Sequence, residues 1–427
     1  MTETPATYRS VFAVREYRYL FGANLLSLVG DHLATLALGF LVFQVSASPM
    51  LAAASIASSY VAWIIGGPVL SVFADRLPRR AVLITCDLVR AVLFLLLLLD
   101  GLPALALVGI AFLAHLFHAP FLSARASVIP EILEGDRYTV ANGLDNFVMS
   151  AGQVIGFGAG GILLTVISTR QALLLDALTF AASALLIRIG MPHRQAADAA
   201  GPDSTTWTDR LAGVTSGVRV VFGDRTLRAY VLLLWVGCAF TFAPEGLIVA
   251  LTDEYHADAR TGGVLLAAAP VGAALGTVWL TRFCAPATRQ RLIIPLALVS
   301  CAVLIPAALH PPLWMLVTLL AVAGFCNCYC VVLNPLFGRA VPDQYRARAF
   351  GVAISGLCAG QGLAMLGAGF VAGYLSPTAV VAISGFVGTV ALAVVAARWH
   401  TIAPAPAPAP APETASVPEV RAVAAAT

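Results

Sequence analysis

Charge is scarce in this chain of 427 residues. Charged residues make up 11% of it and hydrophobic residues 59%, and all 25 basic residues are arginine, because lysine is absent. A soluble domain carries about 25% charged residues, so this composition excludes an ordinary soluble protein. The alternation of apolar and polar residues that a lipid-facing strand needs is also missing. Long apolar runs without this alternation predict an all-α membrane protein. Lipid offers the backbone no hydrogen-bond partners, and a helix satisfies its own backbone groups.

Motifs for catalysis and cofactor binding are missing as well. The chain has no phosphate-binding Walker loop, no nucleophile–base motif and no basic patch for nucleic acid, so we expect neither an enzyme nor a cofactor. Three cysteines cluster in CNCYC at 326–330. On a helix they point in different directions and lack the paired spacing of a zinc site, so we expect small apolar packing residues and no metal.

Twelve apolar segments of about twenty or more residues follow one another along the chain. They run over 19–44, 50–74, 81–99, 103–128, 139–166, 170–190, 228–252, 260–282, 290–309, 312–337, 346–375 and 377–400. We interpret each segment as a membrane-spanning helix.

Arginine placement supports this count. If both termini are cytoplasmic, all but three of the 25 arginines fall in cytoplasmic segments. The exceptions are Arg90, inside the third segment, and Arg170 and Arg260, outside the cell. This is the positive-inside asymmetry of a multi-pass protein of the plasma membrane. The residues before the first segment contain arginines and no apolar core, so we expect no cleavable signal peptide.

Composition also divides the chain. We predict a six-helix bundle at 1–190, a cytoplasmic linker at 191–227, a second six-helix bundle at 228–400 and a disordered proline- and alanine-rich tail at 401–427. The linker ends in a stretch with apolar residues at helical spacing, which predicts an amphipathic helix on the inner membrane face. These apolar residues are Trp207, Leu211, Val214, Val218 and Val221.

The two predicted bundles repeat each other. VFAVREYR at 11–18 matches VFGDRTLR at 221–228, an offset of 210, and a glycine and glutamine pattern in the fifth segment recurs in the eleventh at an offset of 208. Two halves of the same topology, with a site between them near the membrane midplane, are a transporter architecture.

The stretch GGPVLSVFADRLPRR, between the second and third segments, resembles the loop signature of the major facilitator superfamily. Its charged positions are held by Asp75, Arg76, Arg79 and Arg80. Ser71 and Pro78 stand where the family usually has glycine. The resemblance implies that Asp75 caps the eleventh helix and ties the bundles together in the outward-facing state, as a carboxylate at a helix N-terminus could do. Plain positive-inside anchoring is the alternative.

Further stretches of the first half are similar to the bacterial drug-exporter branch of that family, which includes macrolide and enterobactin exporters. They are REYRYLFGANLLSLVGDHL, CDLVRA, ARASVIPEIL followed by ANG, and LLLDALTF. GQVIGFGAGG at 152–161 resembles the antiporter signature of the fifth helix, with Phe157 at its proline position. Its glycines, Gly152, Gly156, Gly160 and Gly161, would serve antiport, or only the close packing that small residues permit.

Ionisable residues inside the membrane are costly and therefore candidates for function. Asp31 lies near the middle of the first segment and shares a helical face with Asn24, Ser27 and Thr35. Such a polar stripe predicts a water-filled cavity. Because burial disfavours the charged form of a carboxylate, we expect Asp31 to take up and release a proton near neutral pH. A packing role is the alternative.

Two further residues are candidates for proton coupling. His115, in the fourth segment, could relay a proton or satisfy a helix contact. Glu245 follows Pro244 in the seventh segment and could carry a second proton or bind a cationic substrate. The amides Gln153, Gln361, Asn327 and Asn334 are expected to line the cavity.

Other charged residues are assigned to a network around the loop signature. We expect Asp87 and Arg90, three residues apart on one helix, to form an ion pair near the inner surface. Arg125 and Asp145 are placed in the same network, and Asp176 near the outer end of the sixth segment, as a gate or packing residue.

Together these observations predict a monomeric secondary transporter with protons, a small organic molecule and the lipid bilayer as its partners. We expect proton-coupled efflux of a drug, natural product or siderophore, because the expected cavity walls carry few charges. Proton-symport uptake of a small metabolite is one alternative, and a non-transporting membrane protein on the same fold is another.

Overall fold

The computed structural model describes residues 7–74, 77–192 and 207–399, and every regular element in these ranges is a helix. The first helices are α1 Tyr8–Phe12, α2 Arg15–Ser46, α3 Pro49–Ala74, α4 Arg79–Leu96, α5 Ala104–Leu116, α6 His118–Ile132, α7 Asp136–Leu163 and α8 Thr169–Gly190. The others are α9 Trp207–Gly223, α10 Arg225–Phe242, η1 Ala243–Leu247, α11 Ile248–Glu254, α12 Ala259–Phe283, α13 Pro286–Ala302, η2 Ile305–Leu309, α14 Leu313–Cys326, α15 Tyr329–Ala340, η3 Asp343–Tyr345, α16 Arg346–Val371 and α17 Pro377–Trp399.

Each of the twelve apolar segments coincides with one helix or with two or three consecutive helices. At two of the interruptions a proline lies close to the break: Pro120 follows the junction of α5 and α6, and Pro244 lies in η1 between α10 and α11. Proline has no N–H to donate to the carbonyl four residues earlier, so it weakens the regular helix at these points. The interruption at η1 also places Glu245 on a short 3₁₀ turn.

Ten helices or helix pairs in the described ranges are long and apolar enough to cross a membrane. The expectation of an all-α membrane protein is therefore confirmed at that level. The two remaining segments correspond to α3 and α4. The described apolar part of α3 is shorter, Pro49–Ile64. Helix α4 carries four charged residues, Arg79, Arg80, Asp87 and Arg90, which lower its hydropathy.

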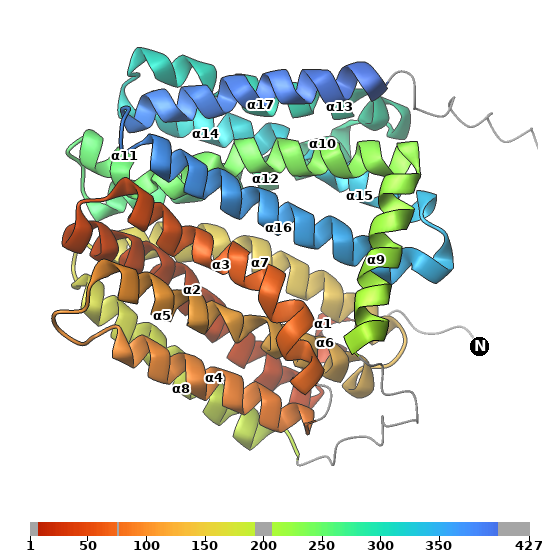
Figure 1. Ribbon diagram of the computed structural model, residues 1–427. Helices are drawn as coiled ribbons and strands as arrows, with labels where there is room; N and C mark the ends of the chain where they lie inside the picture. Colours follow the sequence, from red (N-terminus) through yellow and green to blue (C-terminus); the bar gives the residue numbers. More distant parts are fainter. Residues whose placement is uncertain (1–6, 75–76, 193–206, 400–427) are drawn as a thin grey trace, which may run out of the picture.

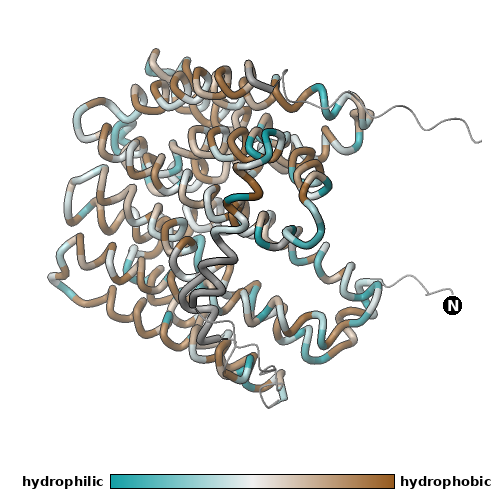
Figure 2. Tube along the Cα trace, turned by 45° about the vertical axis from the view of Figure 1, so that its right-hand side comes forward, coloured by the Kyte–Doolittle hydropathy of each residue, from teal (hydrophilic) through white to brown (hydrophobic). Residues whose placement is uncertain are grey.

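Apart from α9, the long helices lie side by side with their axes roughly parallel. Helices α1–α8 are in the lower part of Figure 1 and α10–α17 in the upper part. In the lower part α2 packs against α7 and α8, and α4 packs against α6 and α8. In the upper part α10 packs against α13, α16 and α17, and α12 against α14. The two groups meet where α3 contacts α16 and where α7 contacts α12. Figure 2 shows apolar residues along the helices and hydrophilic ones concentrated at their ends.

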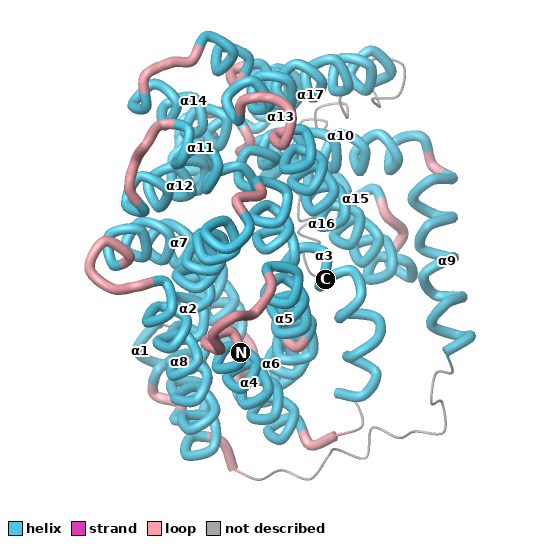
Figure 3. Tube along the Cα trace, turned by 60° about the vertical axis from the view of Figure 1, so that its left-hand side comes forward, coloured by secondary structure: helices cyan, strands magenta, loops and turns pink. Residues whose placement is uncertain are grey.

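Helix α9 runs across the ends of the other helices and is seen at the edge of the molecule in Figure 3. Its described side chains contact α16: Gly217 lies where a Cβ would be 2.9 Å from the Arg348 carbonyl oxygen, and Val221 is buried. Val218 is exposed. The side chains of the other three residues of the predicted apolar face are not described, and linker residues 193–206 and the tail lie outside the described residues.

The glycines of the GQVIGFGAGG stretch bring α7 close to its neighbours. A Cβ on Gly152 would lie 2.5 Å from a Leu28 methyl carbon, and one on Gly156 would lie 2.6 Å from the Cβ of His32. Both partners are on α2. A Cβ on Gly161 would lie 2.7 Å from the Cα of Gly263 on α12. The stretch therefore permits close contact within the first group of helices and also between the two groups.

We expect Gly161→Ala to push α7 and α12 apart, because the new methyl group meets backbone atoms that cannot move aside as a side chain would. Overpacking of this kind costs about 1–3 kcal/mol. The matched control is Gly158→Ala on the same helix, where the new Cβ has nothing within 4 Å. The midpoint temperature of thermal unfolding, measured on the purified protein, should fall for Gly161→Ala only. Equal stability of the two variants would contradict the close contact.

Candidate functional site

An ion pair lies inside the helices of the first group. Arg90 on α4 donates from Nη2 to Oδ1 of Asp31 on α2 at 2.5 Å. The Arg90 side chain is 1% exposed and that of Asp31 is 14% exposed. The guanidinium also lies over the ring of Phe180 on α8, 4.0 Å from its centroid, at a distance typical of a cation–π contact. Three helices, α2, α4 and α8, therefore meet at one arginine.

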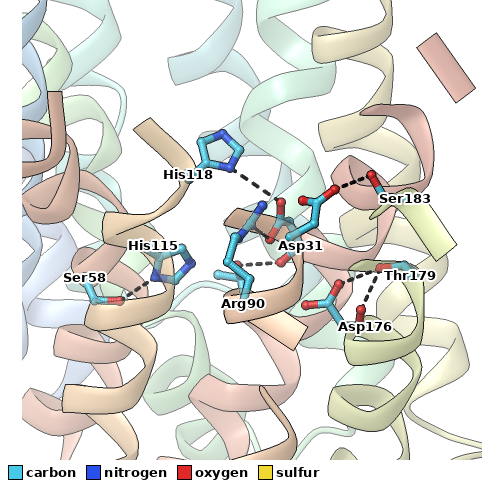
Figure 4. Close-up of polar contacts among 10 residues, drawn as sticks. Asp31, Ser58, Arg90, His115, His118, Asp176, Thr179 and Ser183 are labelled. Atoms are coloured by element: carbon cyan, nitrogen blue, oxygen red, sulfur yellow. Dashed lines mark hydrogen bonds and ion pairs between the residues drawn. The ribbon is translucent and has the colours of Figure 1, made fainter. Parts of the chain in front are cut away.

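Two more carboxylates surround this pair (Figure 4). Asp87 on α4 accepts a hydrogen bond at 2.6 Å from the hydroxyl of Ser183 on α8. Asp176 on α8 accepts one at 3.0 Å from the hydroxyl of Thr179, one turn away. Both aspartates are completely buried. Gly30 makes room for Asp176, because a Cβ there would lie 2.2 Å from the Asp176 Oδ1 atom.

Two histidines approach the same region from the break between α5 and α6. His118 Nδ1 lies 3.9 Å from Oδ2 of Asp31. His115 Nδ1 instead lies 3.1 Å from the hydroxyl of Ser58 on α3. Of the two, His118 is the direct neighbour of Asp31, although His115 is the residue that the sequence singled out for proton coupling.

Asp31 is accessible from a cavity of about 220 Å³ between α2, α6 and α7. Asn24 and Ser27 of the polar stripe line it. The hydroxyl of Thr35 donates to the backbone carbonyl of Asp31 at 2.7 Å, and Thr35 is not among the lining residues. Arg125 and Asp145 also line this cavity and pair with each other at 2.6 Å, between α6 and α7.

A second cavity, of about 390 Å³, lies in the other group of helices, between α10, α15 and α16. Its walls are mostly aliphatic and aromatic, and its polar residues carry no ionised side chain at neutral pH. Three of the four amides that the sequence suggested as cavity-lining, Asn327, Asn334 and Gln361, line this cavity. Gln153 is exposed and belongs to neither cavity.

Glu245 lies where the two groups of helices meet. Its carboxylate accepts a hydrogen bond at 3.1 Å from the hydroxyl of Tyr60 on α3. Next to it, Gly246 packs on Met365 of α16, at a distance that leaves no space for a Cβ. Glu245 thus sits apart from the Asp31 group, at the contact between the two halves of the chain.

The loop signature is described only in part, since Asp75 and Arg76 lie outside the described residues. Arg79 forms an ion pair with Glu131 on α6 and donates to the Ser127 carbonyl at 3.2 Å. Arg80 donates to the Arg188 carbonyl on α8 at 2.7 Å. Both described arginines therefore tie α4 to other helices of the first group.

One sequence expectation needs correction. Arg90 pairs with Asp31 and not with Asp87, because its long side chain reaches across to α2 while Asp87 turns to Ser183. Asp176, expected as a gate or packing residue, packs against Gly30, the residue before Asp31, and so lies beside the candidate site. Helical spacing within single segments could not reveal either contact, because both depend on how α2, α4 and α8 pack. Charge inside an apolar segment was the only available signal.

Comparison with known proteins gives the same family throughout. The family model described as Major Facilitator Superfamily matches residues 20–250 and 245–425. The multidrug efflux pump Tap of Mycolicibacterium fortuitum is 24% identical over 337 residues, 76% of this chain and 81% of that protein. YkuC of Bacillus subtilis (strain 168), an uncharacterised transporter of the Major Facilitator Superfamily type, is 28% identical over 252 residues, 56% of each chain.

Solved structures share the fold. The nucleoside transporter NupG covers 89% of this chain and 99% of its own, with a TM-score of 0.68 and 14% identity. The inward-open xylose transporter XylE from E. coli covers 91% of this chain and 96% of its own, with a TM-score of 0.66 and 13% identity. A bacterial homologue of the iron transporter ferroportin, inward-facing, covers 93% and 99% with the same TM-score and 14% identity.

We expect Arg90→Gln to destabilise the protein strongly, because it removes the guanidinium shared by the buried carboxylates. Breaking a buried ion pair costs about 3–5 kcal/mol. The control is Arg170→Gln, which breaks an exposed pair with Asp100 worth roughly 0–1 kcal/mol. Thermal unfolding measures both. The loss from Arg90→Gln should shrink at acidic pH, where protonation removes the unpaired negative charge. Equal losses for the two variants would show that Arg90 is not a structural centre.

Proposed function

Since the chain belongs to the Major Facilitator Superfamily, a family of transporters and not of enzymes, we propose that it exports a small organic compound in exchange for protons. The carrying observation is the Asp31–Arg90 ion pair beside a cavity within the membrane helices. A proton and a cationic substrate can each neutralise this carboxylate, so binding of one would release the other. The multidrug efflux pump among the relatives supports export.

In this proposal the chain forms two six-helix bundles with twelve spans, including α3 and α4, and both termini are cytoplasmic. The charged residues of α4 support its inclusion, since Asp87 and Arg90 are buried against other helices and need no contact with lipid. The contacts of α3 with α16 and of α7 with α12 join the bundles. Alternating access would open and close these contacts around the two cavities.

The second cavity suggests the substrate class. Aromatic and aliphatic walls favour a flat or amphiphilic organic molecule, and the three amides provide hydrogen bonds without charge. The cavity in the first bundle adds carboxylates. A compound with an apolar body and a basic group would use both, as would a natural product or drug of that kind.

The first test is a flux measurement on purified protein in liposomes that contain a pH-sensitive dye. With a proton gradient imposed, a panel of amphiphilic compounds should elicit compound-dependent proton flux in the wild type. We expect Asp31→Asn to abolish this flux, because the amide cannot take up the exchanged proton. Asp100→Asn, at an exposed pair, is the matched control and should transport normally.

Three outcomes would decide between proposals. Full flux in Asp31→Asn would remove the coupling role of this residue. Protons and compound moving in the same direction would establish uptake by symport. Silence for every compound, in wild-type protein shown to be folded, would contradict export of this substrate class and favour a non-transporting protein on the same fold.

The second cavity gives a separate prediction. We expect Asn334→Leu to weaken substrate binding and raise KM up to about tenfold, the effect of losing one neutral hydrogen bond. The maximal rate should change little, since the proton site lies in the other bundle. Thr318→Val is the control, because that exposed hydroxyl only donates to the Trp314 carbonyl of its own helix. An unchanged KM in Asn334→Leu would place the substrate elsewhere.

A further inference from the structure

We propose that Asp176 is a second proton-binding site, which passes its proton to Asp31 while Arg90 moves from Asp31 to Asp176. This proposal deepens the exchange mechanism above and rests on it. In the step, the Asp176 carboxyl loses its proton and the Asp31 carboxylate gains it. The guanidinium follows the negative charge, so that the net charge of the group does not change.

The first support is a charge count. Three carboxylates interact with one guanidinium: Asp87 and Asp176 are completely buried, and Asp31 is 14% exposed. An unpaired buried charge is so costly that the group takes up a proton instead. With all three carboxylates ionised the group would carry two uncompensated negative charges, so two protons are needed for neutrality. The other titratable side chains facing the group are those of His32, Cys86, His115 and His118.

The second support is the pattern of unpaired atoms. Oδ1 of Asp87 and Oδ2 of Asp176 are buried without a hydrogen-bond partner among the described residues. Both oxygens of Asp31, by contrast, lie within ion-pair distance of a basic side chain. The guanidinium charge therefore belongs to Asp31 in this conformation. We place one proton on Asp87 and one on Asp176, whose free oxygens would otherwise bear unpaired charge.

The third support is the position of Asp176. Its Oδ1 atom occupies the space of the missing Gly30 side chain, directly beside Asp31. Nε and Nη1 of Arg90 are buried and have no hydrogen-bond partner, so the guanidinium has donors available for a second carboxylate. Asp176 interacts electrostatically with both Asp31 and Arg90. It is completely buried, whereas Asp31 is accessible from the cavity, so a proton on Asp176 exchanges through Asp31.

Infrared spectroscopy of the purified protein tests this without any substrate, because a protonated carboxyl has its own carbonyl-stretch band. At neutral pH the bands of the group are counted against a variant that lacks all three of its carboxyls, so that Glu245 and every other carboxyl cancels. The number of these bands should equal the number of carboxyls in the group minus one. The wild type should show two. Asp176→Asn, Asp87→Asn and Asp31→Asn should each show one, and the double variant Asp31→Asn with Asp176→Asn should show none.

The Asp31→Asn variant is the decisive one, since its remaining proton must be on Asp87 if Arg90 has moved to Asp176. Its band should therefore lie where the single band of Asp176→Asn lies, since that proton is also on Asp87, and not where the band of Asp87→Asn lies, since that proton is on Asp176. Asp145→Asn, which lies outside the group, is the control and should keep both bands. Size-exclusion chromatography and thermal unfolding confirm that each variant is folded.

Two results would overturn the proposal. A spectrum unchanged by Asp176→Asn would mean that Asp176 carries no proton, and two bands remaining in Asp31→Asn would mean that Arg90 does not change partners. Neither result depends on transport. If the band pattern is as expected but no compound elicits proton flux, the export proposal is rejected and the two proton sites stand. If compounds elicit proton flux but the band pattern is absent, the export proposal stands and the second proton site is rejected.

Discussion

The positive charge of Arg90 is the constraint on which the first group of helices depends. A buried guanidinium needs a carboxylate partner and hydrogen-bond acceptors, because isolated charge in an apolar interior is far too costly. Asp31 supplies the partner from α2 and Phe180 supplies a ring face from α8. The arginine itself comes from α4. These helices are therefore held together by one polar group, because separating any of them would leave a buried charge without its partner.

Small residues make this arrangement possible. Gly30 leaves the space that Asp176 fills, and the glycines of α7 allow that helix to approach α2 closely. At the contact between Gly161 and Gly263 the two halves of the chain meet backbone to backbone. A contact between backbones contains few side-chain interactions to rearrange, so it can separate and re-form as a unit. The polar group lies wholly within one half and can stay intact while the halves move.

Hydropathy was sufficient to locate the helices, since each apolar segment is long and the cost of exposing backbone in lipid leaves one solution. It was also sufficient to select Asp31, because one carboxylate in the middle of a long apolar helix stands out. It could not show that Arg90 crosses to α2 or that Asp176 joins the group. Spacing along a helix fixes which residues share a face, as with Asp87 and Arg90, but the choice of partner depends on the packing of neighbouring helices. For α5, α10, α13 and α14, apolar composition also concealed the breaks.

The two cavities differ in a way that bears on coupling. The one beside Asp31 contains ionisable side chains, while the larger one is lined by amides, thiols and apolar groups. Of the three aspartates around Arg90, Asp31 lines the smaller of the two cavities and the other two are completely buried, so a cation or proton that reaches this group from the cavity meets Asp31 before Asp87 or Asp176. A substrate that neutralises Asp31 frees Arg90 from its partner, and the guanidinium must then find another carboxylate. Asp176 already lies beside Gly30, next to Asp31, where it can accept the guanidinium. Because arginine stays charged, it needs such a second buried carboxylate whenever its first partner is neutralised.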